Sequence, residues 1–207
     1  MLNIAVLVSG GGTNLQALIN AEKRGEIVNG KITCVISSNP DAYALERAKN
    51  NGIATVVVPK KDYPDRADYT AAVTKALVDA KADLVVYAGF MIILDSQIVK
   101  AFPGKMMNVH PALIPSFCGK GFYGLKVHEA VLESGVKLTG ATVHFVTEDC
   151  DAGPIIAQKA VPVLNGDTPE ILQKRVMEEC EWNILPEAVS LFCQGRIKIN
   201  GNKTEVI

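Results

Sequence analysis

The sequence predicts an α/β fold, a doubly wound and mostly parallel sheet with helices on both faces and an antiparallel addition near the C-terminus. Short β-branched apolar runs alternate with stretches of helical character through the first half of the chain, which is the rhythm of βαβ units. These runs are almost continuously apolar, as expected of parallel strands whose two faces are both covered by helices. A glycine-rich turn, Gly10-Gly11-Gly12, joins the first strand to the first helix.

Five apolar runs, separated by helical stretches, predict the parallel part of the sheet. The strands are expected at residues 3–8, 31–37, 53–58, 83–87 and 105–109. The helices are expected at residues 13–24, 42–50, 65–80 and 95–101. Gly52 stands just beyond the second helix, at the position where glycine commonly ends a helix.

The second half of the chain carries the antiparallel addition. Proline and glycine residues indicate a loop over residues 111–124, and a helix is expected at 126–134. Residues 138–146 alternate between two unlike faces, and the run at 154–163 is predicted to lie beside them as an antiparallel strand. A long helix is expected at 168–192, with a capped start at Thr168-Pro169-Glu170, and a last short strand at 196–200. No repeat or linker divides the chain, so one domain over residues 1–207 is expected.

The composition is that of a water-soluble globular protein. Its 207 residues suffice for one well-filled core, and 48% of them are hydrophobic and 21% charged. A net charge of -1 gives no broad attraction for nucleic acid or membranes, so neither is expected as a partner. Five cysteines without a CxxC spacing predict free thiols in the cytoplasm. The first apolar run, residues 4–8, is too short for a secretion signal or a membrane span.

The glycine turn is a candidate phosphate site. Backbone amides at a helix N-terminus bind phosphate when side chains do not obstruct them, and Thr13 and Asn14 add donors or cap the helix. No Gly-Lys-Ser/Thr follows, so the turn is not a P-loop. Leu15 stands where a dinucleotide fingerprint has its third glycine, and no carboxylate ends the second strand. Two interpretations stay open, a tight strand-to-helix turn or a site for a single phosphomonoester.

Among the three histidines, His110 is the candidate for chemistry. It follows a strand end, and Asn108, two residues earlier, points to the same side of that strand. Open α/β folds bind ligands at this edge of the sheet, where an amide donor and an imidazole can stabilise an oxyanion and move a proton. The alternative is a capping asparagine beside a buried histidine with satisfied hydrogen bonds. His128 is expected to be a surface or packing residue, and His144 lies within an alternating strand.

Asp151 is the third candidate. It precedes Ala152-Gly153-Pro154, a tight turn that fixes the direction of the side chain, although such acidic loops are mostly solvated. A carboxylate beside His110 is expected to raise the pKa of the imidazole and keep it protonated. The chain has no G-x-S-x-G elbow, no i, i+4 histidine pair and no cysteine pair, so neither a serine hydrolase nor a metal site is expected. Cys118 is interpreted as a loop cysteine.

Five ordered segments resemble the phosphoribosylglycinamide formyltransferases, folate-dependent enzymes of purine synthesis and one-carbon metabolism with a Rossmann-like fold. The segments are IAVLVSGGGTNLQALI, VVYAGFMIIL, MMNVHPALIP, GATVHFVTEDCDAGPII and PVLNGDTPEIL. The resemblance extends from Leu2 to about Val189. Its Asn-x-His-Pro and Asp-x-Gly-Pro motifs are specific to folate-dependent formyltransferases and their hydrolytic relatives.

The resemblance implies transfer of a formyl group from 10-formyltetrahydrofolate, as cosubstrate, to the amine of glycinamide ribonucleotide, without a metal. It implies that His110 is the acid that assists the tetrahedral intermediate and that Asn108 holds the oxyanion. Asp151 then raises the pKa of His110 and helps to move the proton of the attacking amine. The implied ligand contacts are Gly12, Thr13 and Asn14 for the ribose phosphate, and Arg66, Met91, Ile92, Ile93, Leu94 and Asn108 for the folate. A cytoplasmic monomer or homodimer is expected.

The chain departs from the family pattern at three places. Ile92 stands where many relatives have an arginine. Cys180 stands where the glutamate that contacts the acceptor is expected, and either of its neighbours, Glu179 or Glu181, is a candidate substitute. Residues 115–126 form a longer, glycine-rich loop, which is interpreted as a lid with Lys120 as an extra contact or as a surface excursion.

Three other functions compete with this one. Formyltetrahydrofolate hydrolases share the reactive residues but add an N-terminal regulatory domain, which is not expected here because the first strand is predicted at residue 3. Methionyl-tRNA formyltransferases carry a C-terminal tRNA domain, whereas a short tail and a near-neutral charge are expected here. A non-catalytic nucleotide-binding module, built on the glycine turn, would bind phosphate ligands without moving a formyl group.

Overall fold

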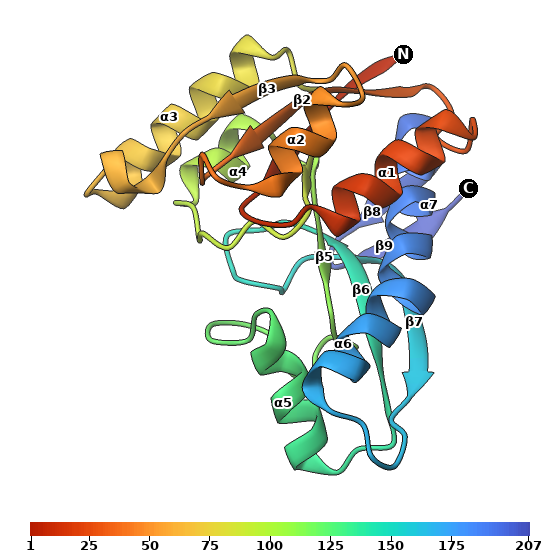
Figure 1. Cartoon of the computed structure of the whole chain (residues 1–207). Coiled ribbons are helices and arrows are strands. Elements are labelled where there is room, and N and C mark those ends of the chain that lie inside the picture. Colours follow the sequence, from red (N-terminus) through yellow and green to blue (C-terminus); the bar gives the residue numbers. More distant parts are fainter.

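The computed structural model describes residues 1–207 and contains one seven-stranded sheet in the order β3-β2-β1-β4-β5-β6-β7 (Figure 1). Strands β1 to β5 pair in parallel, while β5 with β6 and β6 with β7 pair antiparallel. The predicted fold class is therefore confirmed. The strands are β1 Leu2–Val8, β2 Gly30–Ser37, β3 Ala54–Val57, β4 Leu84–Tyr87, β5 Met106–His110, β6 Leu138–Phe145 and β7 Ile155–Pro162.

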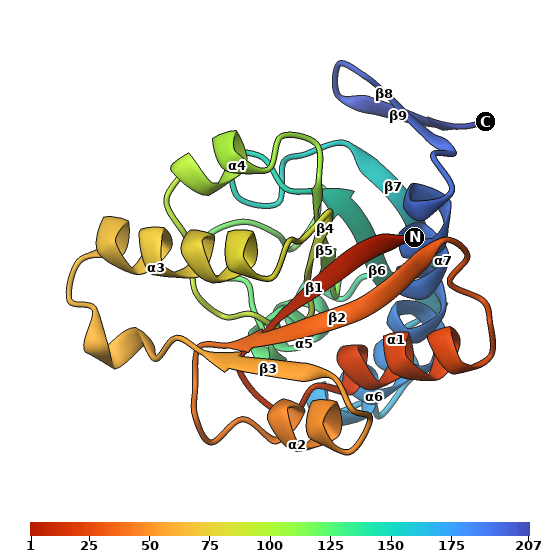
Figure 2. The same ribbon diagram turned by 90° about the horizontal axis from the view of Figure 1, so that it is seen from above.

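Helices cover both faces of the sheet, with α3 and α4 on one face and α1, α2 and α7 on the other (Figure 2). Alternate residues of β1 supply the two cores: Ile4 and Val6 pack toward α1 and α7, whereas Ala5 and Leu7 pack toward α3. This two-sided burial explains the continuous apolar runs. The helices are α1 Thr13–Lys23, α2 Tyr43–Lys49, α3 Arg66–Asp79, α4 Gln97–Ala101, α5 Leu125–Ser134, α6 Pro169–Val176 and α7 Trp182–Cys193, with a 3₁₀ turn at Lys60–Asp62.

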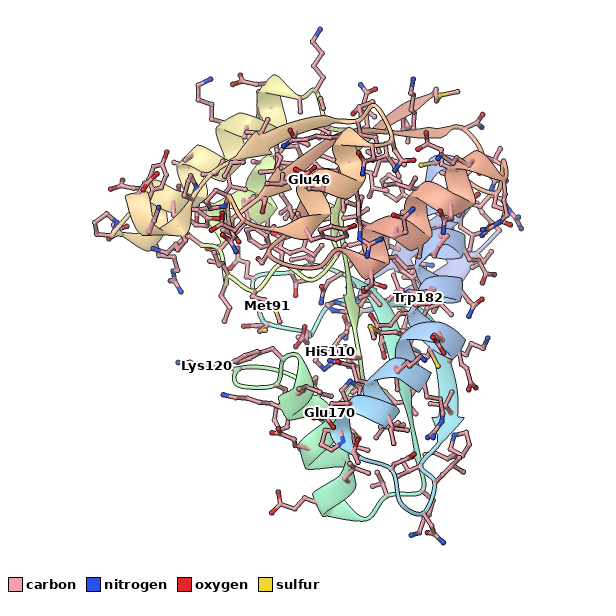
Figure 3. All side chains as sticks on the ribbon, in the orientation of Figure 1. Glu46, Met91, His110, Lys120, Glu170 and Trp182 are labelled. Carbon is pink, nitrogen blue, oxygen red and sulfur yellow. The ribbon has the colours of Figure 1, made fainter.

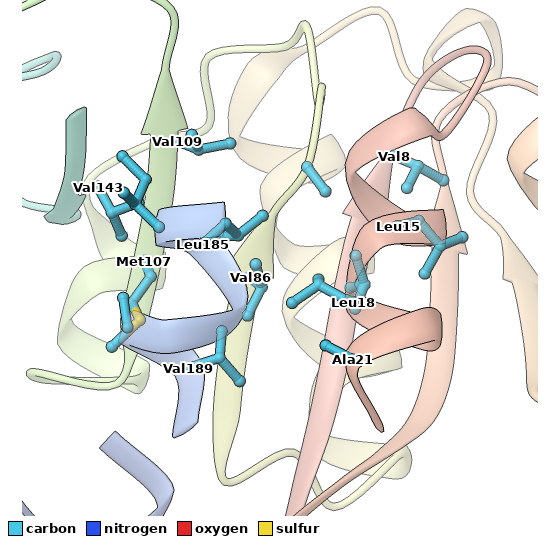
Figure 4. Close-up of a cluster of buried hydrophobic side chains, with 14 of the residues drawn as sticks. Val8, Leu15, Leu18, Ala21, Val86, Met107, Val109, Val143, Leu185 and Val189 are labelled. Atoms are coloured by element: carbon cyan, nitrogen blue, oxygen red, sulfur yellow. The ribbon is translucent and has the colours of Figure 1, made fainter. Parts of the chain in front are cut away.

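The larger core joins the helical layer to the sheet from β2 to β7. Leu18 of α1 lies next to Val86 of β4 in this cluster, and Leu185 of α7 lies near Val143 of β6 (Figure 4). The parallel and antiparallel halves of the sheet therefore share one apolar interior. None of the helices combines the length and the apolar character that a membrane crossing requires.

The predicted helix over 168–192 is interrupted. A π-helical turn, Met177–Glu181, separates α6 from α7. Pro186 lies inside α7 and has no N–H to donate to the carbonyl of Trp182, one turn earlier, so the regular bonding pattern is broken just after the π turn. The apolar period continues across the interruption, which is why the sequence pattern predicts one unbroken helix.

The last predicted strand is one half of a hairpin. β8 Ile197–Asn200 pairs antiparallel with β9 Lys203–Val206, and together they form a separate two-stranded sheet. Gly201 has a positive φ of 59° in the two-residue turn between them, a conformation that favours glycine. The second strand of the hairpin was not predicted.

Candidate active site

A cleft of about 680 Å³ opens at the carboxyl ends of β1, β4 and β5, the edge where open α/β sheets place their ligands. Its lining comes from the start of α1, the segment after β4, the end of β5, the loop before α5, the segment after β6 and the π turn. Met91 and Lys120 extend from opposite sides of its mouth, with His110 deeper in the molecule (Figure 3). The predicted reactive residues therefore meet in one cavity with most of the predicted ligand residues, whereas Gly12 and Arg66 are not part of its lining.

Asn108 and His110 both line the cleft from β5, as their spacing predicts. The antiparallel register places His144 of β6 directly opposite Asn108. The Asn108 amide donates through Nδ2 to His144 Nε2 at 3.2 Å and makes a longer contact of 3.4 Å with Asp151 Oδ1. His144 is thus a site residue that the sequence reasoning missed.

Asp151 is held against this group by its backbone and by hydrogen bonds. It has a positive φ of 53°, and its Oδ2 accepts a hydrogen bond from the Gly119 N–H at 2.9 Å. Its carboxylate oxygens lie 3.7 Å from His110 Nδ1 and 3.5 Å from His144 Nε2. Burial raises the pKa of Asp151. Contact with His144, the positive charge that His110 carries at the acidic pH where Asp151 titrates, and the Gly119 N–H outweigh this effect and lower the pKa to about 2.

The turn after Asp151 tolerates only glycine at its second position. A Cβ on Gly153 would lie 1.8 Å from the carbonyl oxygen of Phe145, which is far inside van der Waals contact. The end of β6 and the start of β7 can lie this close together because Gly153 has no side chain. The Asp-x-Gly-Pro motif therefore fixes the position of the carboxylate by a close backbone contact.

The burial of His110 contradicts the expectation that its ring is kept protonated. Burial lowers the pKa of His110 and outweighs the opposing effects of Asp151 and of the Phe117 carbonyl, so the net direction is downward. His110 Nε2 lies 2.8 Å from the Phe117 carbonyl oxygen, which can only accept, so Nε2 carries a hydrogen. The ring is therefore neutral at pH 7 with its other nitrogen, Nδ1, toward Asp151.

The glycine turn presents unused backbone donors. Gly12 has a left-handed φ of 72°, and no N–H from Gly11 to Asn14 donates to another atom of the protein. Thr13 and Asn14 line the cleft directly. Asn14 is buried, and its Oδ1 has no hydrogen-bond partner while its Nδ2 donates to Glu181 Oε2 at 2.6 Å.

Glu181 is the carboxylate that faces the cleft from the π turn. Cys180 is buried in the apolar core and Glu179 is exposed, so of these three residues only Glu181 lines the cleft. Burial raises the pKa of Glu181 to about 7, against the lowering effect of the Asn14 hydrogen bond. A buried carboxyl group in a cleft with so strongly raised a pKa is a candidate functional residue.

The segment after β4 forms an apolar wall of the cleft with four residues, Met91, Ile92, Ile93 and Leu94. Arg66 does not line the cleft. Its Nη2 lies 3.5 Å from Asp95 Oδ2, and Asp95 is the residue of this pair that reaches the lining.

The loop before α5 covers the cleft from the opposite side. A Cβ on Gly124 would lie 3.6 Å from the Met91 methyl group, so the two sides of the mouth are close together. Cys118 donates to the Pro115 carbonyl oxygen at 3.3 Å, a local loop contact. His128 of α5 is fully buried, neither of its ring nitrogens has a partner, and burial lowers its pKa to about 4. It is thus a packing residue at the cleft floor rather than a surface residue.

No cluster of three or more histidine, cysteine or carboxylate side chains in the chain is arranged to hold a metal ion.

Known proteins are similar to this chain in sequence and in fold. Residues 2–189 match the formyl transferase family. The chain is 39% identical to phosphoribosylglycinamide formyltransferase of Escherichia coli (strain K12) over 201 residues, which cover 97% of this chain and 92% of that protein. It is also similar to the crystal structure of glycinamide ribonucleotide transformylase 1 from Symbiobacterium toebii, with a TM-score of 0.94 and 43% identity over 100% of this chain and 94% of that chain.

Other relatives are longer than this chain. The chloroplastic phosphoribosylglycinamide formyltransferase of Arabidopsis thaliana is 42% identical over 196 residues, which cover 94% of this chain and 66% of that protein. The trifunctional purine biosynthetic protein adenosine-3 of Gallus gallus is 43% identical over 198 residues, and 19% of its length is covered. The chain belongs to the formyl transferase family, and the relatives named above, to which it is similar, include phosphoribosylglycinamide formyltransferases.

Proposed function

We propose that this chain transfers a formyl group from 10-formyltetrahydrofolate to the amine of glycinamide ribonucleotide, a step of purine synthesis. The observation that carries the proposal is the position of Asn108, His110 and Asp151 in one cleft, between free backbone donors on one side and an apolar wall on the other. The names of the similar proteins support the same reaction.

We place the acceptor at the α1 end of the cleft. Its phosphate accepts hydrogen bonds from the free N–H groups of Gly12, Thr13 and Asn14 at the helix N-terminus. The carboxylate of Glu181 and the unpartnered Asn14 Oδ1 then accept hydrogen bonds from the glycinamide part of the acceptor. These two buried acceptors provide the polar selectivity at this end.

The folate lies against the opposite end in this proposal. Met91, Ile92, Ile93 and Leu94 supply an apolar slot for the pterin ring, whose edge is read by backbone groups. Asn108 borders the slot, so the formyl group is presented to the reactive residues. Arg66, through its ion pair with Asp95, is proposed to contribute to folate binding at the mouth.

In the proposed reaction the acceptor nitrogen forms a bond to the formyl carbon, and the bond from that carbon to N10 of the folate breaks. One proton leaves the acceptor nitrogen and one arrives at N10. The Asn108 amide turns from its long contact with Asp151 to the oxyanion. The Asp151 carboxylate relays the proton of the acceptor nitrogen to Nδ1 of the neutral His110 ring and stabilises the resulting imidazolium, and Nε2–H then donates its hydrogen to N10 of the folate.

The contact between His110 Nε2–H and the Phe117 carbonyl is exchanged for substrate in this scheme. Phe117 belongs to the loop over residues 115–126, so loop movement accompanies binding in the proposal.

We further propose that residues 1–207 act as one domain in the cytoplasm, as a monomer or homodimer, without a metal and without nucleic-acid partners. A single sheet whose two halves share one core supports the domain assignment. Five free cysteines support the cytoplasmic location, and the near-neutral charge supports the absence of nucleic-acid partners.

The deciding experiment incubates the purified chain with 10-formyltetrahydrofolate, with and without glycinamide ribonucleotide, and follows both products. We expect tetrahydrofolate and formylated ribonucleotide to appear together and only when the acceptor is present. Release of formate without the acceptor would support hydrolysis instead. Absence of turnover with phosphate ligands still bound would support a non-catalytic binding module.

A further inference from the structure

Arg47 of α2 is the only lysine or arginine whose side chain bonds to the glycine turn. Its Nε donates to the Gly11 carbonyl oxygen at 2.8 Å, and its Nη1 donates to Gln16 Oε1 at 3.0 Å. The guanidinium also lies 5.0 Å from the centre of the Tyr43 ring. These three contacts fix both the position and the plane of the charged group.

Helix α2 supports the glycine turn at two further points. The Ala44 N–H donates to the Gly10 carbonyl oxygen at 3.1 Å. A Cβ on Gly12 would lie 2.6 Å from the Ala44 Cβ, so only glycine permits this approach of the turn to the helix. The carbonyl groups of Gly10 and Gly11 are therefore both directed toward α2.

This anchoring determines where the unused donors point. In a trans peptide unit the C=O and the following N–H point in opposite directions. Because the Gly11 carbonyl is bonded to Arg47, the N–H of Gly12 points away from α2. It joins the N–H groups of Thr13 and Asn14, which also lack acceptors in the chain and whose residues line the cleft. The hydrogen bond from a cation also polarises the peptide unit and strengthens its N–H as a donor.

The charge balance of the cleft gives Arg47 a second effect. The cationic residues in the lining, Lys120 and Lys126, belong to the loop and helix that follow His110, not to the glycine turn. Glu181 adds a carboxylate at the α1 end. A phosphate dianion bound there meets one nearby fixed positive charge, that of Arg47, on the far side of a single peptide unit.

We infer that Arg47 is a positioning residue for the phosphate of the acceptor: it holds the Gly11–Gly12 peptide with its N–H toward the cleft and supplies the positive charge behind it. The ligand class is a phosphomonoester dianion. The inference rests on the proposed function, because it assigns the acceptor phosphate to the glycine turn. It predicts that Arg47 affects the phosphate-bearing substrate and leaves folate binding and the chemical step unchanged.

The test measures KM and kcat of the full chain and of Arg47→Gln, Arg47→Lys and Lys49→Gln with glycinamide ribonucleotide and with the corresponding riboside, which lacks the phosphate. Lys49→Gln is the matched control, because it removes one exposed charge from the same helix and its partner is Glu46. We expect Arg47→Gln to raise KM for the ribonucleotide by about ten- to a hundredfold, the range for loss of one hydrogen bond to a charged group. Arg47→Lys should recover part of this loss.

For Arg47→Gln we also expect kcat, KM for the folate and kcat/KM for the riboside to stay within about twofold, and the inhibition constant of inorganic phosphate to rise in parallel with KM. An equal loss for ribonucleotide and riboside, or an unchanged KM for the ribonucleotide, would overturn the inference. If Arg47→Gln does not fold, the same comparison in Arg47→Lys decides the question. Absence of formyl transfer by the unaltered chain would instead reject the proposed function itself.

Discussion

Replacement of Glu181 by glutamine should stabilise the protein at neutral pH while it impairs the proposed reaction. The carboxyl group is 5% exposed and accepts one hydrogen bond, from Asn14. Burial raises its pKa from an ordinary 4.5 to about 7. A glutamine amide oxygen accepts the same hydrogen bond without a charge, so Glu181→Gln removes the cost of ionisation in the interior.

The magnitude follows from the two pKa values. Between pH 4.5 and 7 the folded chain keeps the proton that the unfolded chain releases, so the free energy of unfolding falls as pH rises through this interval. The pKa differs by about 2.5 between the folded and unfolded chain, and each pKa unit is worth about 1.4 kcal/mol, so the ionisation of Glu181 lowers the free energy of unfolding by about 3 kcal/mol above pH 7. The stability of Glu181→Gln relative to the unaltered chain should therefore be close to zero at pH 4.5, rise steadily, and level off near 3 kcal/mol above pH 7.

Urea unfolding of both proteins at several pH values between 4.5 and 8.5 measures this difference. Glu179→Gln is the control, because it changes an exposed carboxylate in the same π turn and should give no pH-dependent difference. A constant difference across the whole range, or a difference that shrinks as pH rises, would refute the reasoning. In the formyl-transfer assay Glu181→Gln should raise KM for the acceptor, since a charged partner of the acceptor is lost.

Two further substitutions test the packing around the cleft. Gly12→Ala should lower the free energy of unfolding by about 1–3 kcal/mol more than Gly25→Ala does. Both glycines have a left-handed φ, but only Gly12 faces the Ala44 methyl group. Equal urea unfolding midpoints of the two variants would contradict the contact with α2. Burial lowers the pKa of His128 to about 4, so the free energy of unfolding should fall as pH falls below 6.5, by about 2 kcal/mol at pH 5. His128→Phe should abolish this acid sensitivity, because phenylalanine does not titrate. Identical pH dependence of unfolding in both proteins would remove His128 from that account.

The sequence predicts most of the fold because local patterns determine it. Each strand of the parallel sheet is buried on both faces, so its apolar run is visible without knowledge of its neighbours. The interruption at Met177–Glu181 is not visible in this way, since the apolar period continues across it. The Gly201-Asn202 pair that turns β8 into β9 does carry a hairpin signal, and it could have predicted the second strand.

The site is predicted in part, and the omissions depend on contacts between distant residues. Asn108 and His110 share one strand, so their common direction follows from spacing alone. His144 reaches the site only through the antiparallel register of β5 and β6, 36 residues away from Asn108. Glu181 faces the cleft because of the π turn, and the lowered pKa of His110 results from burial, which a residue pattern does not contain.

The central claim is that Asp151, through His110, moves the proton during formyl transfer. The most direct test is kcat of Asp151→Asn at saturating 10-formyltetrahydrofolate and glycinamide ribonucleotide, with the affinity for both ligands measured by calorimetry. The account predicts that both ligands still bind and that kcat falls by about 10²- to 10⁴-fold, the usual contribution of acid–base catalysis. A kcat close to that of the unaltered chain, with both ligands bound, would contradict it.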